Sequence, residues 1–190
     1  MATVYGVMAM LEGRRVNLRV ADIGDVPRLA GWFSDPAFAG EYQHFPVQVP
    51  ASHLEERIRR HELYHSEWVD FIIEDRSGEG AGWAAHYTSA PNFGWTEIGF
   101  AVTPPERRRG YASEAASLLV DYLFLTRDCP RVQAVADMDN IASVRVLEKS
   151  GFKREGVLRK SLWNAKGEWA DGVICGVVRD EWQSPRILRR

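Results

Sequence analysis

Residues Thr96–Ala116 read TEIGFAVTPPERRRGYASEAA and join a strand pattern to a helix pattern through a basic turn. Ile98, Phe100 and Val102 alternate with smaller or polar residues, which is the period of a half-buried strand. Two prolines follow, and proline ends a strand because it cannot donate a hydrogen bond to the sheet. Beyond Gly110, apolar residues recur at the spacing of a helix. The pattern therefore predicts a strand, a tight turn and a helix in direct succession.

The turn at this junction has the properties of an anion-binding site. A helix N-terminus presents backbone N–H groups that have no partner within the helix, and it carries roughly half a positive charge. Gly110 allows a ligand to approach the backbone closely, and Arg107, Arg108 and Arg109 add full positive charges. A phosphate or pyrophosphate suits such a site best.

Composition favours an ordinary globular protein and excludes several classes of function. The chain has 190 residues, of which 45% are apolar and 26% charged, so we expect one domain over residues 1–190 with a core from about 14 to 180. A net charge of −2 disfavours nucleic acid as a partner. No apolar run reaches the roughly 20 residues of a membrane span, and the N-terminus lacks a signal-peptide pattern. Cys129 and Cys175 have no metal-type spacing, which predicts reduced thiols in a cytoplasmic protein.

The remaining segments predict a mixed sheet with flanking helices. Residues up to Gly13 are expected to be a loose end, and Ala37–Pro50 is expected to be an ordered loop. Strand patterns occupy residues 15–20, 68–73, 81–88, 131–136, 152–163 and 169–178, and helix patterns occupy 22–33 and the segments that begin at Ser52 and Asn140. This order combines antiparallel hairpins with a strand–helix–strand crossover, whose two strands should be locally parallel. The expected fold class is therefore α+β.

Several motifs along the chain resemble one known family. The segment Arg107–Ala112 fits the loop (Gln/Arg)-x-x-Gly-x-(Gly/Ala). Four further motifs follow in order: Asn140–Ser143, Leu147–Phe152, Glu155–Arg159 and Trp169-x-Asp171. On these residues the chain resembles the GNAT superfamily of N-acyltransferases over about residues 15–178. It looks most like the RimJ/RimL branch, which acetylates the N-termini of ribosomal proteins and is close to enzymes that modify small amines.

The resemblance implies a fold, a co-substrate and a reaction. The GNAT fold has a mixed, mostly antiparallel central sheet flanked by helices, with a splayed parallel strand pair around the coenzyme site. The implied co-substrate is acetyl-coenzyme A, without a metal, and the implied acceptor is a primary amine of a protein N-terminus or a small molecule. Homodimers are common in the family. A coenzyme-binding regulatory module without turnover is the alternative from another class.

The resemblance also assigns residues to the coenzyme. It places the backbone of Arg108 to Ala112, including Gly110 and Tyr111, around the pyrophosphate, and it places the arginines on the other phosphates. The backbone around Val102 would lie beside the pantetheine arm and stabilise the oxyanion. Asn140 would lie near the coenzyme, although a helix-starting asparagine is commonly just a cap.

Two residues are candidates for proton transfer. Glu97 lies on the strand that leads to the loop, where many relatives place a general base. Ser143 matches a serine near the thioester sulfur, which would protonate the leaving thiolate. The competing interpretations are a structural carboxylate for Glu97 and a surface serine for Ser143, and Asp171 is interpreted as structural rather than catalytic.

A second motif competes with this interpretation. His61, Glu62 and His65 match H-E-x-x-H, which places two histidines on one helical face for zinc and supplies a glutamate as general base. A hydrolytic zinc site needs a third ligand, for which His86 and Glu79 are candidates without a recognisable motif. The alternative is an amphipathic helix whose apolar stripe the two histidines extend. We expect no metal at this motif.

The acceptor is expected to contact two loops, one formed by Phe38–Pro50 and the other by the hairpin at Asn164. Aromatic residues there suit a flat or apolar acceptor, whereas clustered carboxylates suit a polycation. Glu41 is the single carboxylate in the first loop, which disfavours an aminoglycoside.

Overall fold

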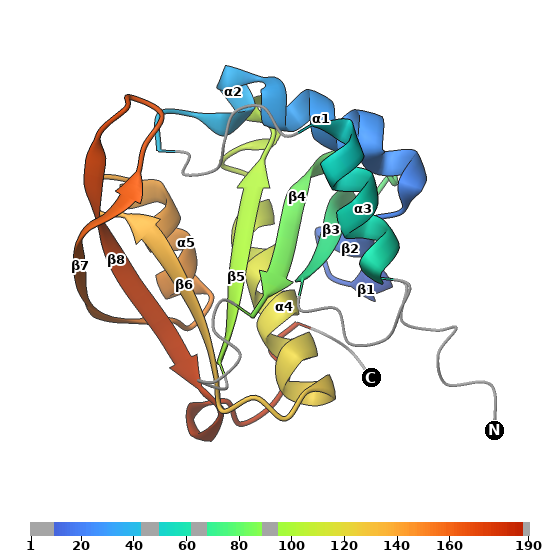
Figure 1. Cartoon of the computed structure of the whole chain (residues 1–190). Coiled ribbons are helices and arrows are strands. Elements are labelled where there is room, and N and C mark those ends of the chain that lie inside the picture. Colours follow the sequence, from blue (N-terminus) through green and yellow to red (C-terminus); the bar gives the residue numbers. More distant parts are fainter. Residues whose placement is uncertain (1–9, 43–49, 62–67, 89–94, 188–190) are drawn as a thin grey trace, which may run out of the picture.

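The computed structural model describes residues 10–42, 50–61, 68–88 and 95–187, in which eight strands form one sheet (Figure 1). The strand order across the sheet is β1-β2-β3-β4-β5-β6-β8-β7. The strands are β1 (Met10–Glu12), β2 (Val16–Val20), β3 (Trp68–Asp75), β4 (Gly80–Tyr87), β5 (Trp95–Val102), β6 (Arg131–Asp137), β7 (Lys153–Trp163) and β8 (Trp169–Val178).

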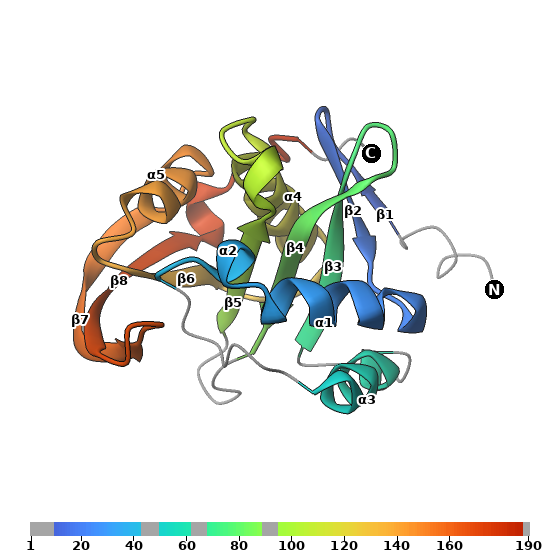
Figure 2. The ribbon, with the colours of Figure 1, turned by 90° about the horizontal axis from the view of Figure 1, so that it is seen from above.

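Helices cover both faces of this sheet, as the view from above shows (Figure 2). One face carries α1 (Val26–Ser34), α2 (Pro36–Ala39) and α3 (Ala51–His61), and the other carries α4 (Tyr111–Thr126) and α5 (Ile141–Lys149). The described residues also include the short 3-10 helices η1 (Ile23–Asp25) before α1, η3 (Pro104–Glu106) before α4 and η4 (Arg179–Glu181) after β8. In the described ranges, no helix has both the length and the apolar character that crossing a membrane requires.

The two faces of the sheet bury separate hydrophobic clusters. Side chains of β5 alternate between them, since Ile98 and Val102 pack with the α4 side while Ala101 packs with the α1–α3 side. Leu118 and Leu119 of α4 are completely buried. Leu29 of α1 and Leu54 of α3 are also completely buried, and since burying one such side chain stabilises the fold by about 1.5–3 kcal/mol, both helical layers are firmly attached to the sheet.

The parallel pair β5–β6 is short, and its strands diverge. Their register runs only from Trp95 opposite Arg131 to Glu97 opposite Gln133, after which pairing stops while both strands continue. Figure 1 shows β5 and β6 separating toward their C-terminal ends. The other neighbouring strands are antiparallel. The predicted α+β class with a mixed, mostly antiparallel sheet and a splayed parallel pair is thus confirmed.

Two expectations about the N-terminal part were wrong. Met10–Glu12 is a strand rather than part of a loose end, because it pairs with β2 and buries Leu11. The sequence did not indicate this strand, since three residues are too few to show an alternating pattern. Pro36–Ala39 is a short helix that overlaps the start of the loop expected over Ala37–Pro50. Asp35 caps this helix by accepting a hydrogen bond of 2.9 Å from the backbone N–H of Ala37.

Candidate functional site

The basic turn between β5 and α4 has a backbone suited to an anion. Arg108 and Gly110 both lie in the left-handed region, with φ of 66° and 84°. The first hydrogen bond of α4 runs from Glu114 N–H to the Gly110 carbonyl over 3.1 Å. The N–H groups of the three residues between them, 111–113, therefore have no acceptor within the helix. The structure thus has a helix N-terminus directly after a left-handed glycine at this turn, and the binding of an anion there stays a prediction.

The first of the three arginines is committed to the protein's own backbone. The Nε of Arg107 donates to the Val102 carbonyl over 3.1 Å, and its Nη2 donates to the carbonyls of Ala37 and Phe38 over 2.8 and 3.1 Å. Arg107 thereby ties the end of β5 to α2. Its predicted phosphate contact stays a prediction, and its evident role is to hold the loop against the sheet.

The other two arginines lie on the surface of the loop. Arg109 forms an ion pair with Glu106, and its guanidinium carbon lies 5.8 Å from the centre of the Tyr111 ring. Arg108 is exposed. Both residues add positive charge close to the N-terminus of α4 in the sequence, and a helix N-terminus favours a phosphate.

The backbone of Val102 points toward the side from which β6 has diverged. Thr103 N–H donates to the Ala81 carbonyl over 2.9 Å, so these two residues form a hydrogen-bonded pair of the β4–β5 ladder. The next pair, Val102 with Gly82, is then a non-hydrogen-bonded pair whose N–H and carbonyl groups point away from the partner strand. An extended ligand could pair with Val102 from that side, as the resemblance implies.

Asn140 caps α5, which is the second of the two roles that the sequence suggested for it. Its side-chain oxygen accepts a hydrogen bond of 3.0 Å from the N–H of Ser143 at the start of α5. Ser143 is half-buried. At the opposite end of α5, the hydroxyl of Ser150 donates to the Ser113 carbonyl over 3.0 Å, which fixes α5 against the first turn of α4. Contacts of Asn140 or Ser143 with a coenzyme remain predictions.

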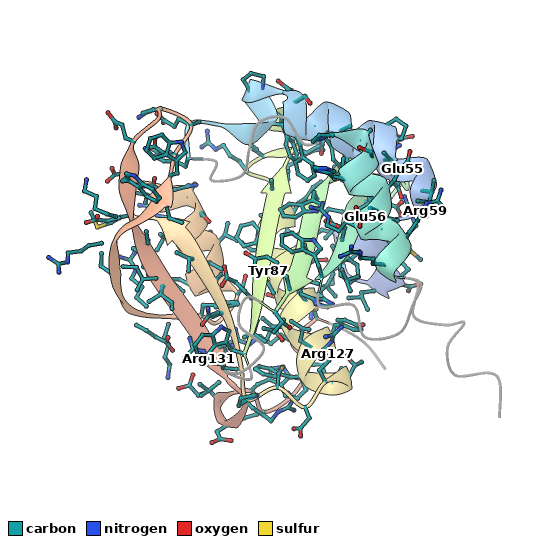
Figure 3. The ribbon with its side chains drawn as sticks, in the orientation of Figure 1. Glu55, Glu56, Arg59, Tyr87, Arg127 and Arg131 are labelled. Atoms are coloured by element: carbon teal, nitrogen blue, oxygen red, sulfur yellow. The ribbon has the colours of Figure 1, made fainter. Side chains whose placement is uncertain are left out.

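Glu97 lies at the last position where β5 pairs with β6, and beyond it these two strands separate. The hydroxyl of Tyr87 donates to one carboxylate oxygen over 2.9 Å, and the amide of Gln133 donates to the other over 3.1 Å. Figure 3 shows Tyr87 near the middle of the sheet, in front of β4 and β5. Burial raises the pKa of Tyr87, and the Glu97 charge raises it further, so Tyr87 stays a donor at neutral pH.

The carboxylate and the phosphate loop occupy opposite ends of one strand. Glu97 and Val102 are five residues apart on β5, which corresponds to about 16 Å in an extended strand. Any ligand that uses both the loop and Glu97 must therefore be long and extended. Tyr87 and Gln133, which orient Glu97, were missed by the sequence reasoning because their contacts come from other strands.

A buried ionic network supports the Tyr87 side of the site. The ring of Tyr87 stacks on Trp68 with 4.3 Å between centres. Asp70 is completely buried and accepts two hydrogen bonds from Arg57, over 2.7 and 3.0 Å, and one of 2.7 Å from the Trp83 indole. Because Arg57 belongs to α3, this network fastens α3 to the sheet. A lone aspartate in an apolar strand pattern was the available sequence signal.

The two loops expected to contact the acceptor also touch each other. Lys166, in the β7–β8 hairpin, forms an ion pair of 2.9 Å with Glu41 and lies 5.9 Å from the Tyr42 ring centre. Trp163 and Trp169 of the same hairpin meet edge to face and are about half exposed. Residues 43–49 of the first loop lie outside the described residues.

Asp171 has the structural role that was expected of it. Its carboxylate accepts a hydrogen bond of 2.8 Å from the N–H of Lys160. Lys160 has a φ of 52° and lies in an irregular stretch where the register of β7 against β8 shifts. Asp171 therefore stabilises an unusual backbone conformation in β7.

The competing zinc motif falls largely outside the described residues. His61 ends α3, and Glu62 and His65 lie beyond the described part. Of the suggested third ligands, His86 is buried with its ring centre 5.9 Å from that of Tyr122, on the α4 side of the sheet. The described residues contain no group of three His, Cys, Asp or Glu side chains that could hold a metal ion.

Comparison with known proteins assigns the chain to a family. Residues 15–153 match the family model described as the acetyltransferase (GNAT) domain. The chain belongs to the GNAT family. Among curated GNAT relatives, YnaD of Bacillus subtilis, an uncharacterized N-acetyltransferase, is 38% identical over 45% of this chain. That match spans about half of YnaD, 50% of its length. YkkB of Bacillus subtilis is 40% identical over 79% of this chain and 87% of its own.

Solved GNAT structures share the fold. RimL, a ribosomal L7/L12 alpha-N-protein acetyltransferase in complex with coenzyme A, aligns with a TM-score of 0.78 at 19% identity, covering 90% of this chain and 99% of its own. Spermidine N-acetyltransferase from Vibrio cholerae, in complex with coenzyme A and spermine, aligns with a TM-score of 0.78 at 18% identity, covering 88% and 98%. At these identities the likeness concerns the fold.

Proposed function

We propose that this protein transfers the acetyl group of acetyl-coenzyme A to a primary amine. The observation that carries the proposal is the left-handed Gly110 at the N-terminus of α4, directly after the strand that separates from its parallel neighbour. That arrangement offers a diphosphate the N–H groups of residues 111–113, which have no acceptor within the helix, and offers an extended arm the side of β5 that β6 has left. Membership of the GNAT family supports the same reaction.

The chemistry requires a neutral amine close to the thioester. The amine nitrogen attacks the thioester carbonyl, the carbonyl oxygen takes up negative charge, and the thiolate leaves with a proton. Orientation supplies much of the acceleration. The Val102 N–H, which points to the open side of β5, is the proposed donor to the oxyanion.

Glu97 and Ser143 are the proposed proton-transfer groups. At pH 7 roughly one α-amino group in seven is neutral, against roughly one lysine amine in 2,500. An α-amine therefore needs little help, and a carboxylate acting through water suffices. Tyr87 and Gln133 keep the Glu97 carboxylate in a fixed orientation, which suits a group that must accept a proton at a defined position.

A thiol-release assay with acetyl-coenzyme A against a panel of small amines and N-terminal peptides tests the proposal. We expect release that depends on an amine, and we expect Glu97→Gln and Ser143→Ala each to lower kcat at least tenfold while coenzyme affinity changes little. Ser161 is an exposed serine on β7, and Ser161→Ala serves as the control, for which we expect an unchanged kcat. Tight coenzyme binding without release for any amine would favour the regulatory-module alternative. If the purified protein held stoichiometric zinc and lost it together with activity, the result would favour a zinc hydrolase that uses His61, Glu62 and His65.

A further inference from the structure

The phosphate loop touches a turn that is far away in the sequence. The turn between β1 and β2 brings Arg15 beside the loop, where its Nη1 donates to the Arg109 carbonyl over 2.9 Å. A Cβ atom placed on Gly110 would lie 3.3 Å from the same nitrogen. The guanidinium of Arg15 is thus packed against the backbone at the two residues that precede α4.

This turn is itself anchored to α4. Glu114, in the first turn of the helix, is 8% exposed. One of its carboxylate oxygens accepts hydrogen bonds from the backbone N–H groups of Arg15, over 2.6 Å, and Val16, over 3.3 Å. A carboxylate is favoured at a helix N-terminus by the macrodipole. The backbone of Arg15 is therefore fixed relative to the first turn of α4, from which its exposed side chain reaches the loop.

A third segment holds the turn from its other side. Arg76, in the turn between β3 and β4, donates from Nη1 to the Gly13 carbonyl over 3.3 Å and to the Asn17 side chain over 3.1 Å. Figure 2 shows the β1–β2 and β3–β4 turns at the same edge of the molecule as the start of α4. The β1–β2 turn that carries Arg15 is consequently held both by α4 and by the β3–β4 turn.

We infer that Arg15 is a positioning residue for the coenzyme, which fixes the loop in its anion-binding conformation before the ligand arrives. The inference rests on the proposed function, because it concerns the same loop. Arg15 fixes the carbonyl of Arg109, and this restrains the peptide that leads into Gly110. Without that restraint the loop must be ordered at the moment of binding, and the cost of ordering lowers affinity.

The chain offers a matched control for this inference. Arg14 is the neighbouring residue in the same turn, is exposed and carries the same charge. Within the described residues, no hydrogen bond joins Arg14 to residues 107–112. A general electrostatic attraction of phosphate to the turn predicts equal effects of Arg14→Ala and Arg15→Ala, whereas the positioning role predicts an effect of Arg15→Ala alone.

The test is calorimetric titration of coenzyme A into the wild type, Arg15→Ala and Arg14→Ala, with steady-state kinetics in parallel. Arg15→Ala should raise the Kd for coenzyme A and the KM for acetyl-coenzyme A about tenfold, while kcat and the KM for the amine stay within twofold. Arg14→Ala should stay within twofold throughout. Amide exchange in the free protein should accelerate over residues 108–113 in Arg15→Ala only, and thermal unfolding shows that each variant is folded.

Each adverse outcome has a distinct meaning. Equal Kd values for the two variants, or an unchanged Kd in Arg15→Ala, would overturn the positioning role and leave the proposed function in place. An effect that disappears with dephospho-coenzyme A would show direct contact with the 3′-phosphate instead of positioning. Absence of coenzyme binding by the wild-type protein would overturn both the inference and the proposed function.

Discussion

Replacing Gly110 with alanine tests the left-handed backbone of the phosphate loop, and the added Cβ atom would also lie 3.3 Å from the Nη1 of Arg15. Gly110 has φ of 84° and ψ of 5°, a conformation that costs a residue with a Cβ atom about 1–2 kcal/mol. In the free Gly110→Ala variant the loop can relax out of this conformation, and coenzyme binding must then restore it. Since 1.4 kcal/mol is a factor of ten, the Kd for acetyl-coenzyme A should rise about 5- to 30-fold.

Gly78→Ala provides the matched control. Gly78 has φ of 87° in the β3–β4 turn, and a Cβ atom there would meet nothing within 4 Å. An alanine held in the left-handed conformation costs about 1–2 kcal/mol at either position. Where a variant keeps that conformation, urea unfolding should show this cost as a decrease in the free energy of unfolding. Calorimetry should give a wild-type Kd for Gly78→Ala. Equal Kd values for the two variants would show that the left-handed conformation of Gly110 has no role in coenzyme binding.

Three further perturbations test the structure around the site. Asp70→Ala leaves the Arg57 guanidinium without its carboxylate and should lower the free energy of unfolding by about 3–5 kcal/mol in urea, whereas a loss below 1 kcal/mol would contradict the network. Asp121 is buried and accepts hydrogen bonds from the indole and backbone of the C-terminal segment, so Asp121→Ala should speed proteolysis after residue 182, with exposed Asp128→Ala as control. Burial raises the pKa of the Cys129 and Cys175 thiols, so their reaction with a thiol reagent at pH 8 should be far slower than in urea. Because their folded pKa is raised, the free energy of unfolding should also fall as the pH rises above about 8.5, and rapid labelling of the folded protein would contradict their burial.

The features that the sequence alone determined are local. The strand, the basic turn and the helix of residues 96–116 follow from apolar spacing and two prolines. The Asn140 cap follows from the residue type at the start of a helix. Such patterns depend on neighbours within a few residues, and for that reason they can be read from one chain.

The tertiary structure alone decided which distant residues complete the site. It set the point at which β6 leaves β5, after three paired residues, and it directed Arg107 to the backbone of α2. It also placed Tyr87 and Gln133 against the Glu97 carboxylate. It also showed that Met10–Glu12 pairs with β2 as a strand. The turn after this strand places Arg15 in contact with the phosphate loop. These contacts join residues up to 94 positions apart, and their energies depend on burial and packing that no local sequence pattern encodes.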